Sequence, residues 1–224
     1  MIQSPAAIDY HSARLKMVDS QIRPNKVSDP AIIAAMLAVP RERFVPAALR
    51  GIAYVDRDVP LGGGRYLMEP MVLGRLLQMA AIGRNDAVLD VGCGPGYASA
   101  VMAQLARDVV ALEEDAALAR QAAGLVAELG LRNIASVEGR LASGWAARAP
   151  YDVILIGGAV AAVPSVIAGQ LANGGRLAAV VQAGSGMGRA VLMTRAGDAF
   201  GQRILFDAAT PLLPGFAARP SFEF

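Results

Sequence analysis

The stretch Ala87-Val88-Leu89-Asp90-Val91-Gly92-Cys93-Gly94-Pro95-Gly96-Tyr97 combines an apolar run, a glycine-rich turn and the beginning of a helix. The run from residue 87 to residue 91, interrupted only by Asp90, is typical of a buried central strand in a parallel sheet. The glycines allow the backbone to turn tightly and to approach a ligand closely, and the helix that follows offers free N–H groups at its first turn. A strand, a turn and a helix in this order predict an α/β fold with a nucleotide-type site at the carboxyl edge of its sheet.

An acidic residue at the end of the next strand strengthens this prediction. Glu113 closes the predicted strand 109–113, about 20 residues after the turn, where a carboxylate meets ribose hydroxyls; Glu114 is the alternative if the strand ends one residue later. An Asp two residues before G-x-G-x-G, here Asp90 before Gly92, resembles S-adenosylmethionine-dependent methyltransferases more closely than NAD enzymes. The candidate cofactor-binding residues around the turn are therefore Asp90, Gly92, Cys93, Gly94, Gly96, Tyr97 and Glu113. The alternative is a glycine-rich turn that binds nothing.

Composition limits the class of protein. A chain of 224 residues, 54% hydrophobic and 18% charged, suits one α/β domain with an added segment. The net charge of +2 and the scattered basic residues give no sign of a nucleic-acid partner. Cys93 and His11 are the single cysteine and the single histidine, which argues against an internal disulfide and against cysteine- or histidine-rich metal sites. The amino terminus lacks the apolar core of a signal peptide, and no apolar run approaches about 18 residues, so we expect a cytoplasmic protein without a membrane span.

The second part of the chain alternates strands and helices, which predicts βαβ units and a mostly parallel sheet. We expect strands at 87–91, 109–113, 134–137, 153–156, 176–181, 190–194 and 204–208, and helices at 98–106, 116–129 and 165–172. The last two strands have no clear helix between them, and we therefore expect them to finish the sheet in antiparallel fashion.

The first part of the chain is expected to be helical. Apolar periodicity predicts helices at 12–23, 30–39 and 71–81, the last closed by Gly83 as its cap, and residues 54–70 are expected to form a loop. We divide one compact unit into a helical and substrate-loop segment at 1–75 and a Rossmann-like domain at 76–224. The carboxyl-terminal aromatics Phe216, Phe222 and Phe224 are expected to cover an edge of the sheet.

Several blocks, taken in order, resemble the protein-L-isoaspartate O-methyltransferase family. They are Met17–Ile22, Val39–Pro46, Ala53–Asp56, Val88–Tyr97, Pro150–Ile154, Val163–Pro164 and 170–175. The resemblance covers most of the chain to about residue 182 and is much weaker beyond it. It implies a Rossmann-like S-adenosylmethionine-dependent methyltransferase fold, that is, a mostly parallel seven-stranded sheet with an antiparallel finish and an N-terminal helical segment. It also implies S-adenosyl-L-methionine as the cofactor and S-adenosyl-L-homocysteine as its product.

The resemblance implies a reaction as well. The family esterifies the carboxylate of L-isoaspartyl residues in damaged proteins, which makes a protein or peptide the expected substrate. That carboxylate is already ionised at pH 7, because its ordinary pKa is about 4. Catalysis then depends mainly on holding the acceptor oxygen, the methyl carbon and the sulfur in line, so a chain with one histidine and one cysteine could still be an enzyme.

One departure from the family lies in its substrate block, Gly-Gln-Thr-Ile-Ser-x-Pro. The matching stretch is Gly64-Arg65-Tyr66-Leu67-Met68-Glu69-Pro70, and we take Tyr66, Met68 and Glu69 as the candidate catalytic-loop residues. Met68 cannot donate the hydrogen bond that the family's serine provides. Glu69 brings a negative charge towards the acceptor carboxylate, a repulsion of roughly 1–4 kcal/mol at ~4 Å. Arg65 could offset that charge or bind the acceptor directly.

A second departure follows the third strand of the sheet. The family has Gly-Asp-Gly there, and its Asp helps to position the adenine, whereas the matching residues here are Gly139, Arg140 and Leu141. Arg140 and Leu141 complete the candidate cofactor-binding residues, with Glu138 as an alternative to the missing Asp.

Three hypotheses follow from these departures. They are an active isoaspartyl methyltransferase, a methyltransferase of the same fold for another acceptor such as a small molecule, and a non-catalytic descendant that binds cofactor or a partner. Either a monomer or a homodimer would suit the sequence.

Overall fold

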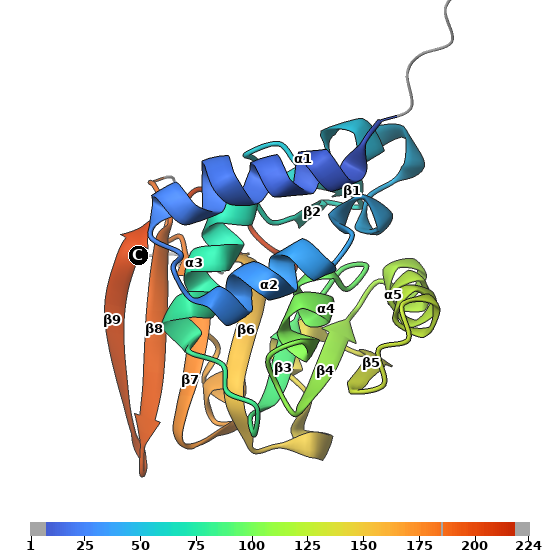
Figure 1. Cartoon of the computed structure of the whole chain (residues 1–224). Coiled ribbons are helices and arrows are strands. Elements are labelled where there is room, and N and C mark those ends of the chain that lie inside the picture. The colour runs from blue at the N-terminus through green and yellow to red at the C-terminus, as the bar shows by residue number, and fades with distance from the viewer. Residues whose placement is uncertain (1–7, 185, 218–224) are drawn as a thin grey trace, which may run out of the picture.

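The computed structural model describes residues 8–184 and 186–217. Its centre is a seven-stranded sheet in the order β5-β4-β3-β6-β7-β8-β9 (Figure 1). The strands are β3 (Ala87–Val91), β4 (Asp108–Glu113), β5 (Ile134–Glu138), β6 (Tyr151–Val160), β7 (Leu171–Val181), β8 (Arg189–Ala196) and β9 (Ala199–Asp207). Strands β3 to β7 are parallel, and β8 and β9 add two antiparallel strands at one edge. The predicted sheet, including its antiparallel finish, is confirmed.

Helices cover the sheet and its upper edge. They are α1 (Tyr10–Met17), α2 (Pro30–Ala38), α3 (Pro70–Ala80), α4 (Tyr97–Ala103), α5 (Ala116–Glu128) and α6 (Ser165–Ala168). In Figure 1, α2, α3 and α4 lie in front of the sheet and α1 crosses above its carboxyl edge. Local capping follows the sequence: Asp29 and Asp115 accept hydrogen bonds from the first turns of α2 and α5, and Pro30 stands at the first position of α2. No helix of the described residues is long and apolar enough to cross a membrane.

The core has two main parts, one on each face of the sheet. All five residues of β3 are buried, and they alternate between the two parts: Val88 packs towards the helices, whereas Leu89 and Val91 pack on the opposite face. Residues of α1, α2 and α3 join the first part together with the sheet. The strand that carries the glycine-rich turn is therefore held from both sides, as the continuous apolar run predicts.

The largest difference from the predicted elements lies between residues 54 and 70. This stretch contains a small antiparallel hairpin of β1 (Val59–Gly62) and β2 (Arg65–Leu67), which is separate from the main sheet. Gly62, Gly63 and Gly64 have φ angles of 95°, 57° and 74°, so the triple glycine is the turn of this hairpin. Two strands this short, one of them containing Pro60, carry too little alternation to be recognised from sequence.

Several element ends also differ from the prediction. Helix α3 ends in a left-handed residue at Ala81 (φ 49°) and not at Gly83. Helix α6 is one turn long, because β7 begins at Leu171, which pairs with Tyr151. Phe216 is buried in the second part of the core, and its carbonyl accepts a hydrogen bond from the N–H of Ala161 directly after β6, so it lies at the carboxyl edge of the sheet. The other two predicted edge aromatics lie outside the described residues.

Candidate functional site

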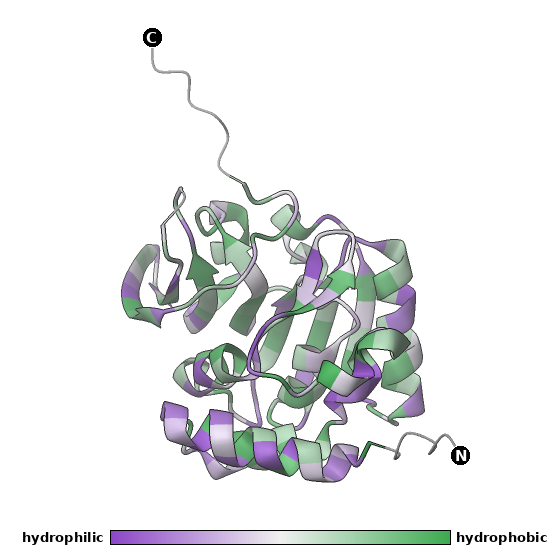
Figure 2. Cartoon of the chain, turned by 90° about the horizontal axis from the view of Figure 1, so that it is seen from above, coloured by the Kyte–Doolittle hydropathy of each residue, from purple (hydrophilic) through white to green (hydrophobic). Residues whose placement is uncertain are grey.

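The glycine-rich turn after β3 has the conformation that its sequence predicts. Gly92, Gly94 and Gly96 have φ angles of 78°, 56° and 96°, which residues other than glycine rarely adopt. A Cβ atom at Gly92 would lie 3.1 Å from the Arg65 guanidinium and 3.3 Å from the Leu213 side chain. The turn therefore needs glycine for its backbone angles and also for the closeness of two segments that are distant in sequence. Figure 2 views the molecule from above, onto the carboxyl edge where this turn lies.

Asp90 is fully buried at the end of β3 and is only half satisfied. Its Oδ2 accepts a hydrogen bond from the Ser99 hydroxyl at 2.5 Å, whereas Oδ1 has no partner. Burial raises the pKa of Asp90 to about 7, although the hydrogen bond from Ser99 opposes the shift. Asp90 lines a narrow cavity of about 20 Å³ together with Tyr66, Met68 and Tyr97. A buried carboxylate oxygen with no donor, at the wall of a cavity, is suited to accept from a polar ligand group.

Glu113 ends β4 and has a full set of donors. Its Oε1 accepts from Arg65 Nη1 at 2.6 Å and from the backbone N–H groups of Glu114 and Asp115 at 2.9 and 3.1 Å. Its Oε2 accepts from the N–H of Gly94 at 2.7 Å. Both side chains of the ion pair are buried, with 5% of Arg65 and none of Glu113 exposed. The carboxylate predicted to meet ribose hydroxyls is thus paired with an arginine in the free protein.

A second cavity, of about 250 Å³, opens beside this ion pair. Its lining comes from the hairpin, the end of β4, the segment after β5 and the carboxyl-terminal segment: Gly63, Arg65, Glu113, Glu114, Asp115, Leu141 and Pro214. The Arg65 guanidinium separates it from the first cavity, since its Nη2 donates to the carbonyl of Gly92 at 2.9 Å, and Gly92 lines the first cavity. The glycine-rich turn, the acidic end of β4 and the β1–β2 hairpin, which carries the candidate substrate block, therefore meet at one arginine.

Most of the predicted site residues gather at these two cavities. The first is lined by Tyr66, Met68, Asp90, Gly92, Cys93 and Tyr97, and the second by Glu113 and Leu141. Gly94 contributes its N–H to Glu113, and Gly96 packs against Ala122 of α5. Arg140 is exposed and lines neither cavity. Burial raises the pKa of the Cys93 thiol well above its usual range, which leaves it unreactive.

Glu69 lies beside the first cavity but does not line it. Its N–H donates to Asp58 Oδ1 at 2.9 Å, and that oxygen also accepts from the Thr210 hydroxyl at 3.1 Å. Burial, together with the negative charges of Asp56 and Asp58, raises the pKa of Glu69 to about 7. Arg65 pairs with Glu113 here, so the prediction that it offsets the charge of Glu69 is wrong for the free protein.

Sequence reasoning missed Arg41, which supports the substrate loop from behind. Arg41 is fully buried and Glu42 nearly so. Arg41 donates to the carbonyls of Ala53 at 2.7 Å and Met68 at 2.8 Å, and its guanidinium lies 4.8 Å from the centre of the Tyr97 ring. The signal was present, since this arginine stands in one of the blocks that carried the family resemblance.

The carboxyl-terminal segment is a second part that the sequence did not reveal. Residues 211–213 pair with the end of β6. The N–H of Leu213 donates to the carbonyl of Ala159 at 2.8 Å, and the N–H of Ala159 donates to the carbonyl of Pro211 at 3.0 Å. The side chain of Leu213 packs against both Gly92 and Gly158. The part of the chain with the weakest resemblance therefore supplies a wall of the candidate site.

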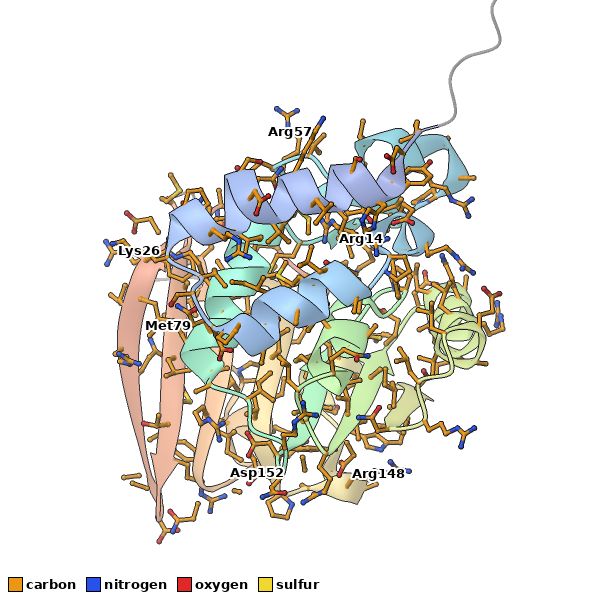
Figure 3. The ribbon with its side chains drawn as sticks, viewed as in Figure 1. Arg14, Lys26, Arg57, Met79, Arg148 and Asp152 are labelled. Atoms are coloured by element: carbon orange, nitrogen blue, oxygen red, sulfur yellow. The ribbon has the colours of Figure 1, made fainter. Side chains whose placement is uncertain are left out.

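The opposite edge of the sheet holds structural contacts. Asp152 and Arg148 lie at the bottom of the view in Figure 3, where Asp152 accepts from the N–H of Ala87 at 2.8 Å.

The N-terminal helix also makes structural contacts: Arg14, labelled below α1, donates to the Tyr54 hydroxyl at 2.9 Å and to the carbonyl of Leu37 at 3.0 Å. No group of three or more His, Cys, Asp or Glu residues within 8–184 and 186–217 is arranged to hold a metal ion.

Comparison with known proteins agrees with this geometry. The chain matches the family model for protein-L-isoaspartate(D-aspartate) O-methyltransferase over residues 12–206. It is 38% identical over 192 residues to protein-L-isoaspartate O-methyltransferase 1 of Rhodopseudomonas palustris, covering 86% of this chain and 78% of that protein. A protein-L-isoaspartate O-methyltransferase of Methylorubrum extorquens is 39% identical over 210 residues, covering 92% of this chain and 91% of the other.

Solved structures show the same fold. A protein-L-isoaspartate O-methyltransferase structure superposes with a TM-score of 0.78 at 26% identity, over 90% of this chain and 66% of that chain. A Plasmodium falciparum structure, described as a protein of this kind in complex with S-adenosyl-L-homocysteine, has a TM-score of 0.76 at 18% identity over 92% of this chain and 99% of that chain. With the turn, the acidic strand end and the hairpin in place, these matches show that the chain belongs to the protein-L-isoaspartate(D-aspartate) O-methyltransferase family.

Proposed function

We propose that this protein transfers a methyl group from S-adenosyl-L-methionine to the carboxylate of L-isoaspartyl residues in proteins or peptides. The observation that carries the proposal is the half-satisfied, fully buried carboxylate of Asp90 at the wall between the glycine-rich turn and the substrate loop. Family membership gives the reaction class, and the unpartnered oxygen of Asp90 at the cavity wall supports a cofactor site at this place. When bound, the cofactor supplies an electrophilic methyl group on a sulfonium.

The residues at the two cavities fit such a cofactor. Asp90 offers an acceptor oxygen without a donor, suited to an ammonium group, and Glu113 offers a carboxylate at the end of the neighbouring strand. The positive φ angles at Gly92 and Gly94 favour glycine, and because glycine has no side chain the backbone of the turn stays open to a ligand. Leu141 is an apolar wall of the larger cavity. We assign cofactor binding to these residues and to Cys93, and we leave out Arg140, whose side chain is exposed.

The acceptor side of the site works by position. The side chain of Met68 has no N–H or O–H group to donate. Arg41 Nη2 donates to the backbone carbonyl of Met68 at 2.8 Å, so the loop is fixed through its backbone. A carboxylate acceptor needs no base, because it is ionised at neutral pH. A groove of about 510 Å³ beside the loop, with Asp58, Gln182, Thr210 and Pro211 among its lining residues, gives room for the flanking peptide. Alignment of the acceptor oxygen is then the main contribution of the protein.

Two linked measurements test the proposal. Calorimetric titration with S-adenosyl-L-homocysteine should show binding, and Asp90→Ala should abolish it. A methyl-transfer assay should then show turnover on an isoaspartyl peptide and none on the same peptide with an ordinary aspartyl residue. Binding without transfer would reject the isoaspartyl substrate and direct the search to other acceptors, and absence of binding at millimolar ligand would reject both. The cytoplasmic location and the monomer or homodimer state expected from the sequence belong to this proposal, and cell fractionation and light scattering test them.

A further inference from the structure

Arg65 joins the substrate hairpin to the cofactor turn through a buried guanidinium. Its Nη1 lies 2.6 Å from Glu113 Oε1, and its Nη2 lies 2.9 Å from the carbonyl oxygen of Gly92. Its Nε is buried without any partner. The arginine therefore stands where the proposed cofactor would meet the protein, and it stands there with one donor unsatisfied.

Counting hydrogen bonds at Glu113 shows that the arginine competes for the carboxylate. Oε1 receives three donors, from Arg65, Glu114 and Asp115, which is more than its two lone-pair directions, whereas Oε2 receives one, from Gly94. A ribose diol donates one hydroxyl to each oxygen of such a carboxylate. The two backbone donors at Oε1 belong to the residues that directly follow Glu113 at the end of β4, so Arg65 is the donor that must give way there.

The hairpin that carries Arg65 is built so that it can give way. Strands β1 and β2 pair only with each other and form a two-stranded sheet apart from the main one. The turn between them consists of three glycines with positive φ angles, and the nearest atoms to a Cβ at Gly63 or Gly64 would be 3.9 and 3.6 Å away. Glycine backbones have access to many conformations, so the tip of this hairpin can rearrange while Val59 and Leu67 keep its base in the core.

The charges around the first cavity indicate where the released arginine goes. Asp90 lines that cavity, and Glu69 and Asp58 stand beside it, all of them acidic. Among the described residues that line the two cavities, Arg65 is the one basic side chain. Arg41 lies behind the loop and is committed to two backbone carbonyls. A carboxylate acceptor needs a cation here, and a guanidinium can bind it through two parallel hydrogen bonds.

We propose that Arg65 exchanges partners during binding: it pairs with Glu113 in the free protein and with the acceptor carboxylate once ribose hydroxyls occupy Glu113. Arg65 is then the residue that selects a carboxylate acceptor, and the cofactor must bind before the acceptor. This inference rests on the proposed function for its second half only. The first half concerns Glu113 and the cofactor's ribose alone.

The test is Arg65→Gln, which replaces the arginine with the family's glutamine and leaves the backbone donors of Glu113 in place. In calorimetric titration, S-adenosyl-L-homocysteine should bind this variant roughly tenfold more tightly than the wild type, because the protein no longer has to break the ion pair first. The complex with S-adenosyl-L-homocysteine should bind an isoaspartyl peptide at least about tenfold more weakly, and the KM for that peptide should rise accordingly. Arg65→Lys should fall between the two proteins in both measurements.

Arg75→Gln is the matched control, because it removes one positive charge from α3, where Arg75 lies over the Phe206 ring of β9 at the far edge of the sheet. It should change neither affinity. Unchanged or weaker binding of S-adenosyl-L-homocysteine to a folded Arg65→Gln variant would overturn the exchange at Glu113. Unchanged peptide affinity would overturn the acceptor role. If the wild-type complex bound no isoaspartyl peptide at all, the acceptor role and the proposed function would fail together, while the cofactor titration would still decide the exchange.

Discussion

The cofactor turn and the substrate hairpin meet at Arg65, which donates to the carbonyl of Gly92 and pairs with Glu113 of β4, yet they are held in place in different ways. The turn follows β3, a strand with every residue buried between two parallel neighbours, and Leu213 covers it. The hairpin has two short strands, pairs with nothing else, and leaves 39% of Tyr66 exposed. Under the proposed function, this design would keep the cofactor's reactive group on a rigid element and place the choice of acceptor on an appended segment.

The largest expected effect comes from removing Glu113, the member of the ion pair that stands on the main sheet. Glu113→Ala should lower the free energy of unfolding by about 3–5 kcal/mol, because it leaves the Arg65 guanidinium buried without its partner. It should also abolish binding of S-adenosyl-L-homocysteine. Chemical denaturation and calorimetry measure the two effects, and Asp198→Ala, an exposed change in the β8–β9 turn, is the control. A double variant, Glu113→Ala with Arg65→Gln, should recover part of the lost stability but no binding, because the N–H groups of Gly94, Glu114 and Asp115 still lack their acceptor. If no stability returns, the ion pair is not the cause.

Asp90, at the end of β3, should lower the stability of the folded protein at neutral pH, because its carboxylate is buried. Its pKa is raised to about 7, so the folded protein holds this proton more tightly than the unfolded chain does. The corresponding stability is fully present below about pH 4, the ordinary pKa of an aspartate, and is lost as the pH rises from there to about 7. Between pH 5 and pH 8, Asp90→Asn should therefore gain about 1–3 kcal/mol in stability relative to the wild type, and it should bind S-adenosyl-L-homocysteine poorly throughout. Urea denaturation from pH 5 to 8 gives the difference curve. Glu69 titrates in the same range in both proteins, so it cancels; a flat difference would contradict the shift.

Changes in the hairpin should alter turnover and leave the fold intact. Met68→Ser combined with Tyr66→Thr restores the hydroxyls of the family's substrate block, and one added hydrogen bond to the acceptor should raise kcat/KM on an isoaspartyl peptide about tenfold. The thermal midpoint and the affinity for S-adenosyl-L-homocysteine should stay close to those of the wild type. Tyr66→Thr alone is the control, since it removes a partly exposed ring without adding a donor at residue 68. A folded double variant with no gain would show that the loop is adapted to a different acceptor geometry.

The smallest effect is expected at Arg140. Its exposed side chain lines neither cavity, so Arg140→Ala should change the affinity for S-adenosyl-L-homocysteine by less than about threefold, as surface substitutions usually do. Leu141→Ala, one residue on and buried, should weaken binding clearly more. A large loss at Arg140 would place the adenine against the surface of the segment after β5 and not in the cavity behind it.

The parts of the molecule that were predictable are those specified by short-range pattern. The buried strand before Gly92, the acidic residue at the end of β4 and the antiparallel finish all follow from apolar runs, glycine spacing and the lack of a helix between the last strands. Arg65 and Glu113 are 48 residues apart, and nothing in either local sequence specifies their contact. The burial of Arg41 could not be read from its local sequence, because its partners are backbone carbonyls brought together only by the tertiary fold. The hairpin was missed because its strands are too short to show a period.

The packing of Leu213 on Gly92 also sets a condition on how the site is made during synthesis. About 120 residues separate the turn from this wall, and a ribosome adding roughly 5–20 residues per second takes on the order of ten seconds to produce them. During that time β3, α4, β4 and α5 can already pair and pack, because their contacts are local to one another. The cofactor site is therefore completed long after the strands that carry it, and a pause or truncation between β6 and residue 213 would leave a formed sheet with an open turn.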